Sequence, residues 1–222
     1  MIRLFLTLAF FLFAAPAWAF PTNAVLETFT GADDTTPPNA NWTNAPINGA
    51  SSANVRIRSN GATTASAGTE ADAYWDTTTF NANQESYVTL TLAGAATYSC
   101  VGLRLVNIGG STTDGYVVCA VNSATAVLIY RVDNATWTQI GTIAQTVASG
   151  DSVGGTAIGS RICSWYKVGA GAWTEKQCVN DATYTAGGNI GLVVVGDTTQ
   201  NVADNFGGGN VSAARGGPIF LQ

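Results

Sequence analysis

Hydrophobic and polar residues alternate in short runs along most of the chain that follows Phe20. In Val55-Arg56-Ile57-Arg58 every second residue is apolar, and a similar alternation covers part of residues 87–92. A period of two places successive side chains on opposite faces of a strand, so it predicts half-buried β-strands. Further strand-like runs follow at residues 98–105, 116–121, 126–132, 137–143, 152–158, 161–168, 173–179, 190–195 and 202–206.

Turn residues, rather than amphipathic helical segments, separate these runs. Pairs such as Gly109-Gly110, Asp133-Asn134 and Gly150-Asp151 stand between them and favour tight turns. A parallel sheet needs crossover helices, and the sequence contains no helical period to supply them. We therefore expect an all-β protein, an antiparallel β-sandwich, that forms one domain over residues 20–207 because no linker divides it.

Both ends of the chain differ from this pattern. Residues 1–19 have the features of a signal peptide: Arg3 precedes a short apolar run, and Ala17-Trp18-Ala19 forms a small-x-small cleavage site. The apolar run is short for a membrane span, so we expect cleavage rather than an uncleaved anchor. The mature protein is then secreted, extracellular or periplasmic, and has no membrane span. Residues 208–222 are predicted to be a glycine-rich C-terminal tail, either loose or docked as an extra strand.

The four cysteines are even in number and belong to a chain that we expect to be exported, where disulfides persist. Four cysteines allow three pairings, and the sequence alone does not select among them. Spacing favours the local pairs Cys100–Cys119 and Cys163–Cys178, because the members of each pair lie on successive strand-like runs.

Charge and composition narrow the function. The chain has a formal net charge of −5, only 10% charged residues and no histidine. Its few lysines and arginines are scattered, which argues against nucleic-acid binding and against a basic membrane-binding surface. Without histidine, neither a Ser-His-Asp triad nor an imidazole metal ligand can form.

A series of short phrases, each weak by itself, occurs in a characteristic order. They are Glu27-Thr28-Phe29-Thr30-Gly31, Asn41-Trp42-Thr43, residues 80–88, Gly102-Leu103-Arg104, Gly115-Tyr116-Val117, Gly159-Ser160-Arg161-Ile162, residues 181–187, Ile190-Gly191-Leu192 and Ala203-Asp204-Asn205-Phe206. In this order they resemble the concanavalin A-like lectin/glucanase superfamily, and within it the laminin-G-like jelly-roll domains. The resemblance covers nearly all of the chain after residue 19 and implies a jelly roll of two stacked sheets.

Glucanases of this superfamily carry a Glu-x-Asp-x-x-Glu strand, and no glutamate of this chain stands in such a motif. The nearest arrangements are Glu70-Ala71-Asp72 and residues 72–76, which place carboxylates on one strand face beside Trp75. Glycoside hydrolysis needs two carboxyl groups at a defined separation. We interpret this segment as a strand edge with a packed tryptophan, and we expect no enzyme. A divergent glycoside hydrolase or lyase that uses Asp72 and Asp76 is a third hypothesis.

Tryptophans are the stronger candidates for ligand binding, because sugar rings have apolar faces that stack on aromatic side chains. Trp137 and Trp173 stand beside turns, and Trp75 stands beside the carboxylates. These three are the predicted ligand-binding residues, with packing at a strand edge as the alternative. We expect Trp42 and Trp165 to be core residues.

Calcium is the metal that the resemblance favours, since many jelly rolls of the superfamily carry one ion. Clustered oxygen ligands suit it. Asp33 and Asp34 near the start would approach Asp204 near the end if the terminal strands pair. The loop at Asp181 is a further candidate, and turn capping by these side chains is the alternative.

Two functions of different classes follow. The first is a secreted, non-catalytic, lectin-like domain that binds a polysaccharide or another glycan. The second is an extracellular structural protein, a surface or filament subunit whose partner is itself or another surface protein. Low charge and the apolar end Ile219-Phe220-Leu221 favour the second, because an extended segment can add a strand to a neighbouring sheet.

Overall fold

The structure is a computed structural model that describes residues 19–49, 53–91, 98–196 and 198–212. The described residues form fifteen strands and no helix, as expected for an all-β chain. The strands are β1 (Val25–Glu27), β2 (Trp42–Asn44), β3 (Ala53–Ile57), β4 (Ala62–Thr64), β5 (Glu70–Trp75), β6 (Gln84–Leu90), β7 (Tyr98–Val106), β8 (Asp114–Val121), β9 (Ala126–Asp133), β10 (Thr136–Ala144), β11 (Ser152–Ile158), β12 (Arg161–Lys167), β13 (Trp173–Asn180), β14 (Asn189–Val195) and β15 (Ala203–Asn210). Within this part of the chain, no helix has the length and apolar character needed to cross a membrane.

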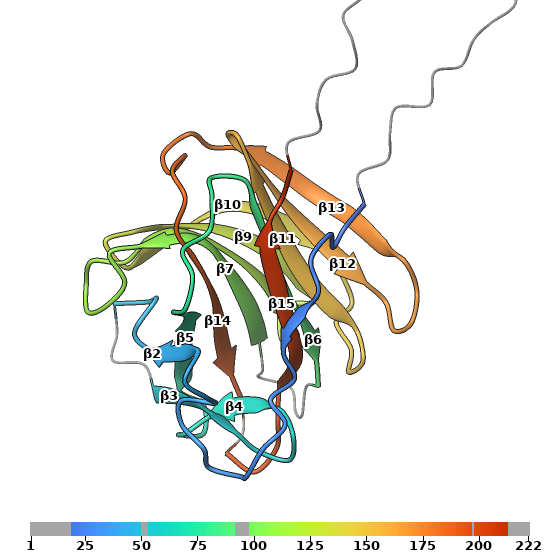
Figure 1. Cartoon of the computed structure of the whole chain (residues 1–222). Coiled ribbons are helices and arrows are strands. Elements are labelled where there is room, and N and C mark those ends of the chain that lie inside the picture. Colours follow the sequence, from blue (N-terminus) through green and yellow to red (C-terminus); the bar gives the residue numbers. More distant parts are fainter. Residues whose placement is uncertain (1–18, 50–52, 92–97, 197, 213–222) are drawn as a thin grey trace, which may run out of the picture.

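The strands form two stacked layers (Figure 1). Sheet A has the order β4-β15-β6-β11-β12-β13, and β1 pairs with β15. Sheet B has the order β10-β9-β8-β7-β14-β5, and β2 pairs with β5. Strand β3 joins the layers, since it pairs antiparallel with β4 and parallel with β5. The fold is therefore the predicted β-sandwich, and its pairing is almost entirely antiparallel.

Sheet B is buried on both faces along its central strands, which explains why they are not amphipathic. Val117 and Val118 are adjacent on β8, and both are fully buried. Val118 belongs to the core between the sheets, with Trp42 and Phe206, whereas Val117 belongs to a second apolar cluster on the outer face. A strand that is covered on both faces needs apolar residues at successive positions.

The two disulfides join neighbouring strands, one in each sheet. Cys100 on β7 is bonded to Cys119 on β8, and Cys163 on β12 is bonded to Cys178 on β13. In both cases the two cysteines are directly paired across the strands. This is the pairing that the spacing in the sequence favours. Both bonds lie on outer faces of the sandwich, within apolar clusters.

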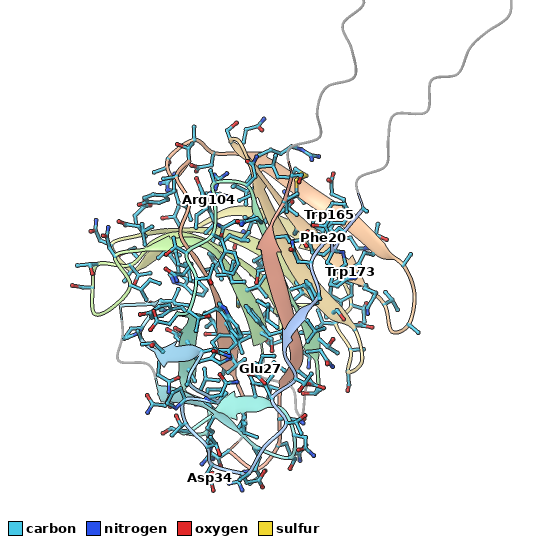
Figure 2. All side chains as sticks on the ribbon, in the orientation of Figure 1. Phe20, Glu27, Asp34, Arg104, Trp165 and Trp173 are labelled. Atoms are coloured by element: carbon cyan, nitrogen blue, oxygen red, sulfur yellow. A yellow bond between two sulfur atoms is a disulfide. The ribbon has the colours of Figure 1, made fainter. Side chains whose placement is uncertain are left out.

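Arg104 on β7 fixes one end of the sandwich from inside (Figure 2). It is 1% exposed, and its guanidinium donates to the carbonyl oxygens of Ala82, Gly159 and Tyr184 at 2.7, 2.8 and 2.7 Å. Burial lowers the pKa of this guanidinium. Because one guanidinium binds carbonyl groups of three separate segments, it connects the loop that contains Tyr184 to both sheets.

The predicted start of the C-terminal tail, residue 208, lies within strand β15. Strand β15 extends to Asn210, and Gly207, Gly208 and Gly209 pair with β6. Side chains would not fit at these positions: a Cβ would meet the Tyr87 ring at Gly207, the backbone of β6 at Gly208 and the Asn23 side chain at Gly209. Residues 1–18 of the predicted signal peptide and the segment Ile219-Phe220-Leu221 lie outside the described residues.

Candidate functional site

A pocket of about 410 Å³ lies on the outer face of sheet B. Three aromatic residues, Tyr98, Tyr130 and Trp137, contribute to its lining, and Asn48 and Glu70 are its polar members. The remaining lining residues are Cys119, Val121, Ala124 and Leu128. The site is thus mainly apolar and aromatic with a few polar groups, which is the usual composition of a small-molecule site.

Strand register brings the aromatic residues to one face. Val121 on β8 is paired with Tyr98 on β7, and Val117 is paired with Tyr130 on β9. Alternate side chains of a strand share a face, so Val117, Cys119 and Val121 all point outward. Their paired residues on the neighbouring strands point to the same face. Two tyrosines that are 32 positions apart in the numbering therefore reach the same pocket.

A loop at residues 45–49 bends over sheet B and forms a wall of the pocket. The Asp72 carboxylate on β5 accepts hydrogen bonds from the backbone N–H groups of Ile47 and Asn48 at 2.7 and 3.3 Å. Ile47 is fully buried over Gly191, where a Cβ would lie 3.1 Å from the Ile47 Cδ1 atom. The missing side chain on β14 therefore allows the loop to pack closely, and this packing positions Asn48 at the pocket.

Trp137 offers the face of its ring rather than its N–H group. The indole N–H donates to the carbonyl oxygen of Ile47 at 3.3 Å, so it is already used inside the protein. The ring packs against Tyr130 with a centroid distance of 5.1 Å and an interplanar angle of 47°. Burial raises the pKa of Tyr130. The two rings form an angled aromatic wall on which an apolar ring face can rest.

The Glu70 carboxylate is the charged group of this lining. The Tyr98 hydroxyl donates to Glu70 Oε2, and Asn48 Nδ2 approaches the same oxygen at 3.5 Å. Burial and, after it, the hydrogen bond to Glu70 raise the pKa of Tyr98, so this hydroxyl stays protonated and keeps donating. The carboxylate is thereby held at the pocket as a hydrogen-bond acceptor.

The other two predicted ligand-binding tryptophans lie elsewhere. Trp75 is 8% exposed and packs edge-on against Trp42 at 5.5 Å in the core between the sheets, so it does not line the pocket. Trp173 lies on the outer face of sheet A, far from the pocket lining in the topology. Of the three, Trp137 is the one that lines the pocket.

Part of the outer face of sheet A is covered by residues 20–24, which we call the N-terminal strap. Phe20 stacks on Trp165 at 4.8 Å with an interplanar angle of 10°, and meets Trp173 edge-on at 4.8 Å (Figure 2). It lies over Gly154, where a Cβ would be 2.5 Å from the Phe20 ring. Glu85 Oε1 accepts the backbone N–H groups of Thr22 and Asn23, each at 2.6 Å.

The predicted calcium ligands do not form a cation site. Asp33 and Asp34 form ion pairs with Arg58 and Arg56, and Asp33 also accepts the Ser59 N–H at 2.7 Å. Asp204 bonds to its neighbour Asn205, and burial raises its pKa. The terminal strands do pair, but the register of β1 on β15 brings Glu27 to Phe206, so Glu27 rather than Asp33 or Asp34 acts on Asp204.

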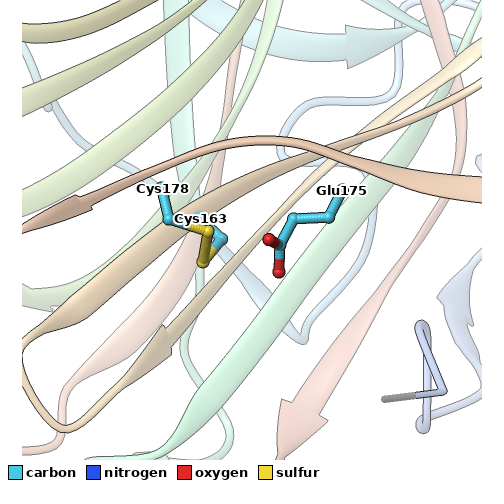
Figure 3. Close-up of side chains that lie close together, drawn as sticks. All are labelled: Cys163, Glu175 and Cys178. Atoms are coloured by element: carbon cyan, nitrogen blue, oxygen red, sulfur yellow. A yellow bond between two sulfur atoms is a disulfide. The ribbon is translucent and has the colours of Figure 1, made fainter. Parts of the chain in front are cut away.

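One group of three potential metal ligands occurs within the described residues, and it does not suit a metal. It consists of Cys163, Glu175 and Cys178 (Figure 3). Both sulfur atoms are in a disulfide, so no thiolate is available. The Glu175 carboxylate is paired with Arg161 at 2.8 Å. The residues present therefore do not fit a calcium or zinc site here.

The carboxylates of β5 do not offer a catalytic pair. Glu70 and Asp72 share the outer face, as their spacing predicts, but Asp72 is fully buried beneath the Ile47 loop. Asp76 accepts a hydrogen bond from the Thr43 hydroxyl at 2.7 Å. Glu70 is thus the single carboxylate of the pocket lining, whereas glycosidases place two carboxyl groups on either side of the scissile bond.

Tyr98, Tyr130 and Asn48 were not among the residues that the sequence singled out. Their contribution depends on strand register and on the path of the 45–49 loop. A signal for the tyrosines exists in the sequence, since Tyr98 and Cys100 on one run and Leu128 and Tyr130 on another each differ by two positions. This signal can be used only if the pairing of the strands is known. The Cys100–Cys119 disulfide gives that pairing for β7 and β8, but not for β9, which carries Tyr130.

No protein-family model matches the sequence, and no curated protein matches it. Solved structures match over most of the chain. The Ca²⁺-bound VIP36 exoplasmic/lumenal domain has a TM-score of 0.57 and 8% identity, and covers 86% of this chain and 91% of its own. A mutant of the Emp46p carbohydrate recognition domain has a TM-score of 0.54 and 10% identity, and covers 85% and 97%. The carbohydrate-binding module CBM66 from Bacillus subtilis has a TM-score of 0.52 and 15% identity, and covers 77% and 92%.

At these identities the likeness concerns the fold. It agrees with the two-layer antiparallel arrangement seen here, and the narrower laminin-G-like resemblance stays a prediction. The chain therefore shares the two-layer, antiparallel β-sandwich fold of the VIP36, Emp46p and CBM66 domains.

Proposed function

We propose that the protein is a non-catalytic carbohydrate-binding module and that the pocket on sheet B holds a sugar ring. The observation that carries this proposal is the angled wall of Trp137 and Tyr130 facing a pocket whose polar members are Glu70 and Asn48. An aromatic face packs against the C–H groups of a sugar, and an acceptor and an amide orient its hydroxyl groups.

The size and chemistry of the pocket support a small organic ligand. Its volume of about 410 Å³ lies within the range of roughly 300–1,000 Å³ that ligand pockets occupy. Binding without catalysis is supported by the single carboxylate of the lining, because glycoside hydrolysis requires a second one at a defined distance. Two of the solved structures that share the fold are described as carbohydrate-binding proteins.

Export of the protein is part of the proposal. Two disulfides favour an oxidising compartment, and Phe20, the first residue after the predicted cleavage site, is also the first residue of the strap that packs on sheet A.

Calcium enters the proposal only as a condition to be varied. VIP36 structures are described both as Ca²⁺-bound and as metal-free, which concerns that protein. In this chain the predicted ligands Asp33 and Asp34 are engaged by arginines. We therefore expect glycan binding to be the same with Ca²⁺ and with a chelator.

The test is a glycan array followed by titration of the best ligand, with W137A compared with the matched control W173A. Both tryptophans are half-buried, but only Trp137 lines the pocket. We expect W137A to weaken binding by about fivefold, because stacking of this kind is worth on the order of 1 kcal/mol, and W173A to bind like the wild type.

Failure of the correctly folded wild type to bind any glycan, with or without Ca²⁺, contradicts the proposal. Loss of binding in W173A together with normal binding in W137A contradicts the location of the site. Near-UV circular dichroism of each variant shows whether the sandwich remains packed.

A further inference from the structure

The charges around the pocket are of one sign. Glu70 lines it, and Asp72 lies two residues away on the same face of β5, beneath the Ile47 loop. Burial raises the pKa of the Tyr98 hydroxyl, and the negative charges of these two carboxylates raise it further. No lysine or arginine belongs to the lining. The nearest basic residue in sequence to Tyr130 is Arg131, and its guanidinium is held by Asp133 and Asp181 at 2.7 and 3.0 Å.

The aromatic wall adds to this bias. The face of an aromatic ring carries negative charge, so it attracts a cation placed over it and repels an anion. Trp137 and Tyr130 meet at 47°, and Tyr98 stands beside the carboxylate to which it donates. A ligand in the pocket therefore contacts π-faces and a carboxylate, without a positive group to balance them.

From this arrangement we propose that the pocket selects glycans whose sugar units carry a protonated amino group, 2-amino-2-deoxyhexose units in particular. The inference rests on the proposed glycan-binding function and names its substrate class. The ammonium group donates to the Glu70 carboxylate in a charge-assisted hydrogen bond, while the ring stacks on the tryptophan. Neutral N-acetylated units lose the charge, and uronic acid units bring a charge of the wrong sign.

An amino sugar fits these residues better than an isolated ammonium ion does. Hydrogen-bonding groups of Asn48 and Tyr98 stand beside the carboxylate, and they can meet the hydroxyl groups of a sugar. A fully methylated ammonium has no N–H to donate and no hydroxyl groups. It would use the aromatic wall alone.

The experiment compares two oligosaccharides of the same length and linkage by calorimetry: a β-1,4-linked glucosamine tetramer and its fully N-acetylated counterpart. We expect the glucosamine tetramer to bind roughly fivefold more tightly at low ionic strength, because a partly exposed charge pair contributes about 1 kcal/mol. The preference should shrink in 0.5 M salt, since such a pair is screened. This salt dependence is measured on the wild type and needs no variant.

A matched pair of variants locates the effect. In E70Q we expect the ratio of the two affinities to fall to about one, whatever happens to the affinities themselves. E175Q removes a carboxylate from β13 in the other sheet, and we expect it to keep the wild-type ratio. Tetramethylammonium and a glucuronic acid oligomer complete the series, and both should bind more weakly than the glucosamine tetramer.

The outcomes separate the inference from the function on which it rests. Equal or tighter binding of the N-acetylated tetramer, of the uronic acid oligomer or of tetramethylammonium overturns the inference. Binding of another neutral glycan, but of neither tetramer, overturns it too and leaves the carbohydrate-binding function standing. A preference that E70Q retains in full overturns the role of Glu70. If the folded protein binds no glycan of any kind, the proposed function fails together with the inference.

Discussion

The two outer faces of the sandwich have similar side chains but differ in how far other parts of the chain cover them. Each carries a disulfide between neighbouring strands and aromatic side chains, in the clusters around Cys163–Cys178 and Cys100–Cys119. On sheet A the strap packs Phe20 against Trp165 and Trp173, and Trp165 is left 8% exposed. On sheet B the 45–49 loop covers only part of the face, and a pocket of about 410 Å³ is left. An aromatic face thus contributes to packing where a segment of the chain stacks on it, and it is suited to binding where it lines an open pocket.

The largest expected effect comes from uncovering sheet A. Phe20→Ala removes a ring that is 8% exposed and stacked on Trp165, so we expect unfolding free energy to fall by about 3 kcal/mol. The matched change on sheet B, Trp137→Ala, removes a half-buried ring and should cost about 1 kcal/mol while it impairs glycan binding. Denaturant unfolding of both variants measures the difference. Equal losses of stability would mean that the two faces do not differ as described.

Removing the disulfides tests the same difference between the two faces, with a slightly smaller expected loss of stability. Their cysteines are 19 and 15 residues apart, so replacing either pair with alanine should lower stability by a similar amount, about 3 kcal/mol or less. Only the sheet B pair touches the pocket, because Cys119 is one of its lining residues. We therefore expect the Cys100→Ala, Cys119→Ala variant to bind glycan more weakly and the Cys163→Ala, Cys178→Ala variant to bind normally, below the melting temperature of each. Normal binding in both would place the ligand outside the pocket.

The smallest effect is a pH dependence at the end of sheet B. Burial by itself would raise the pKa of Asp181, but hydrogen bonds from Thr183, Tyr116 and Arg131 outweigh it and lower the pKa to about 2, against 3.8 for the free group. A depressed pKa stabilises the folded state above the unfolded pKa, and this contribution disappears as the pH falls from about 4 to about 2. Asp181→Asn should therefore cost on the order of 1 kcal/mol at pH 6 and much less at pH 2. Denaturant titrations across this range measure the gap, and a gap that does not change with pH contradicts the prediction.

Local patterns in the sequence predicted most of the longer strands and favoured the disulfide pairing that the structure has. Period-two runs and glycine-containing turns depend on neighbouring residues, and the cysteine pairs are close in sequence and directly opposed across β7–β8 and β12–β13. The same period also held information about Trp75 that the ligand-binding interpretation did not use. Trp75 is three positions from Asp72, so on one strand the two side chains point to opposite faces. The tryptophan therefore enters the core while the carboxylates of β5 point outward.

The pocket and the ion pairs depend on contacts between distant segments. Asn48 reaches the pocket because Asp72 holds its loop, and the aspartates at 33 and 34 meet arginines at 58 and 56 rather than the opposite terminus. Neither fact is contained in a local pattern. The sequence predicted that the first and last strands pair. The register of that pairing decides which carboxylate approaches Asp204, and a shift of a few residues would bring a different one.

The strap imposes an order on the assembly of the protein. Phe20 precedes its partners Tyr87, Gly154, Trp165 and Trp173, the last of them in the final third of the chain. The aromatic surface of sheet A therefore stays open while those later strands are being delivered and paired. Although it is synthesised early, this segment can reach its final position only after β11, β12 and β13 have been made and paired.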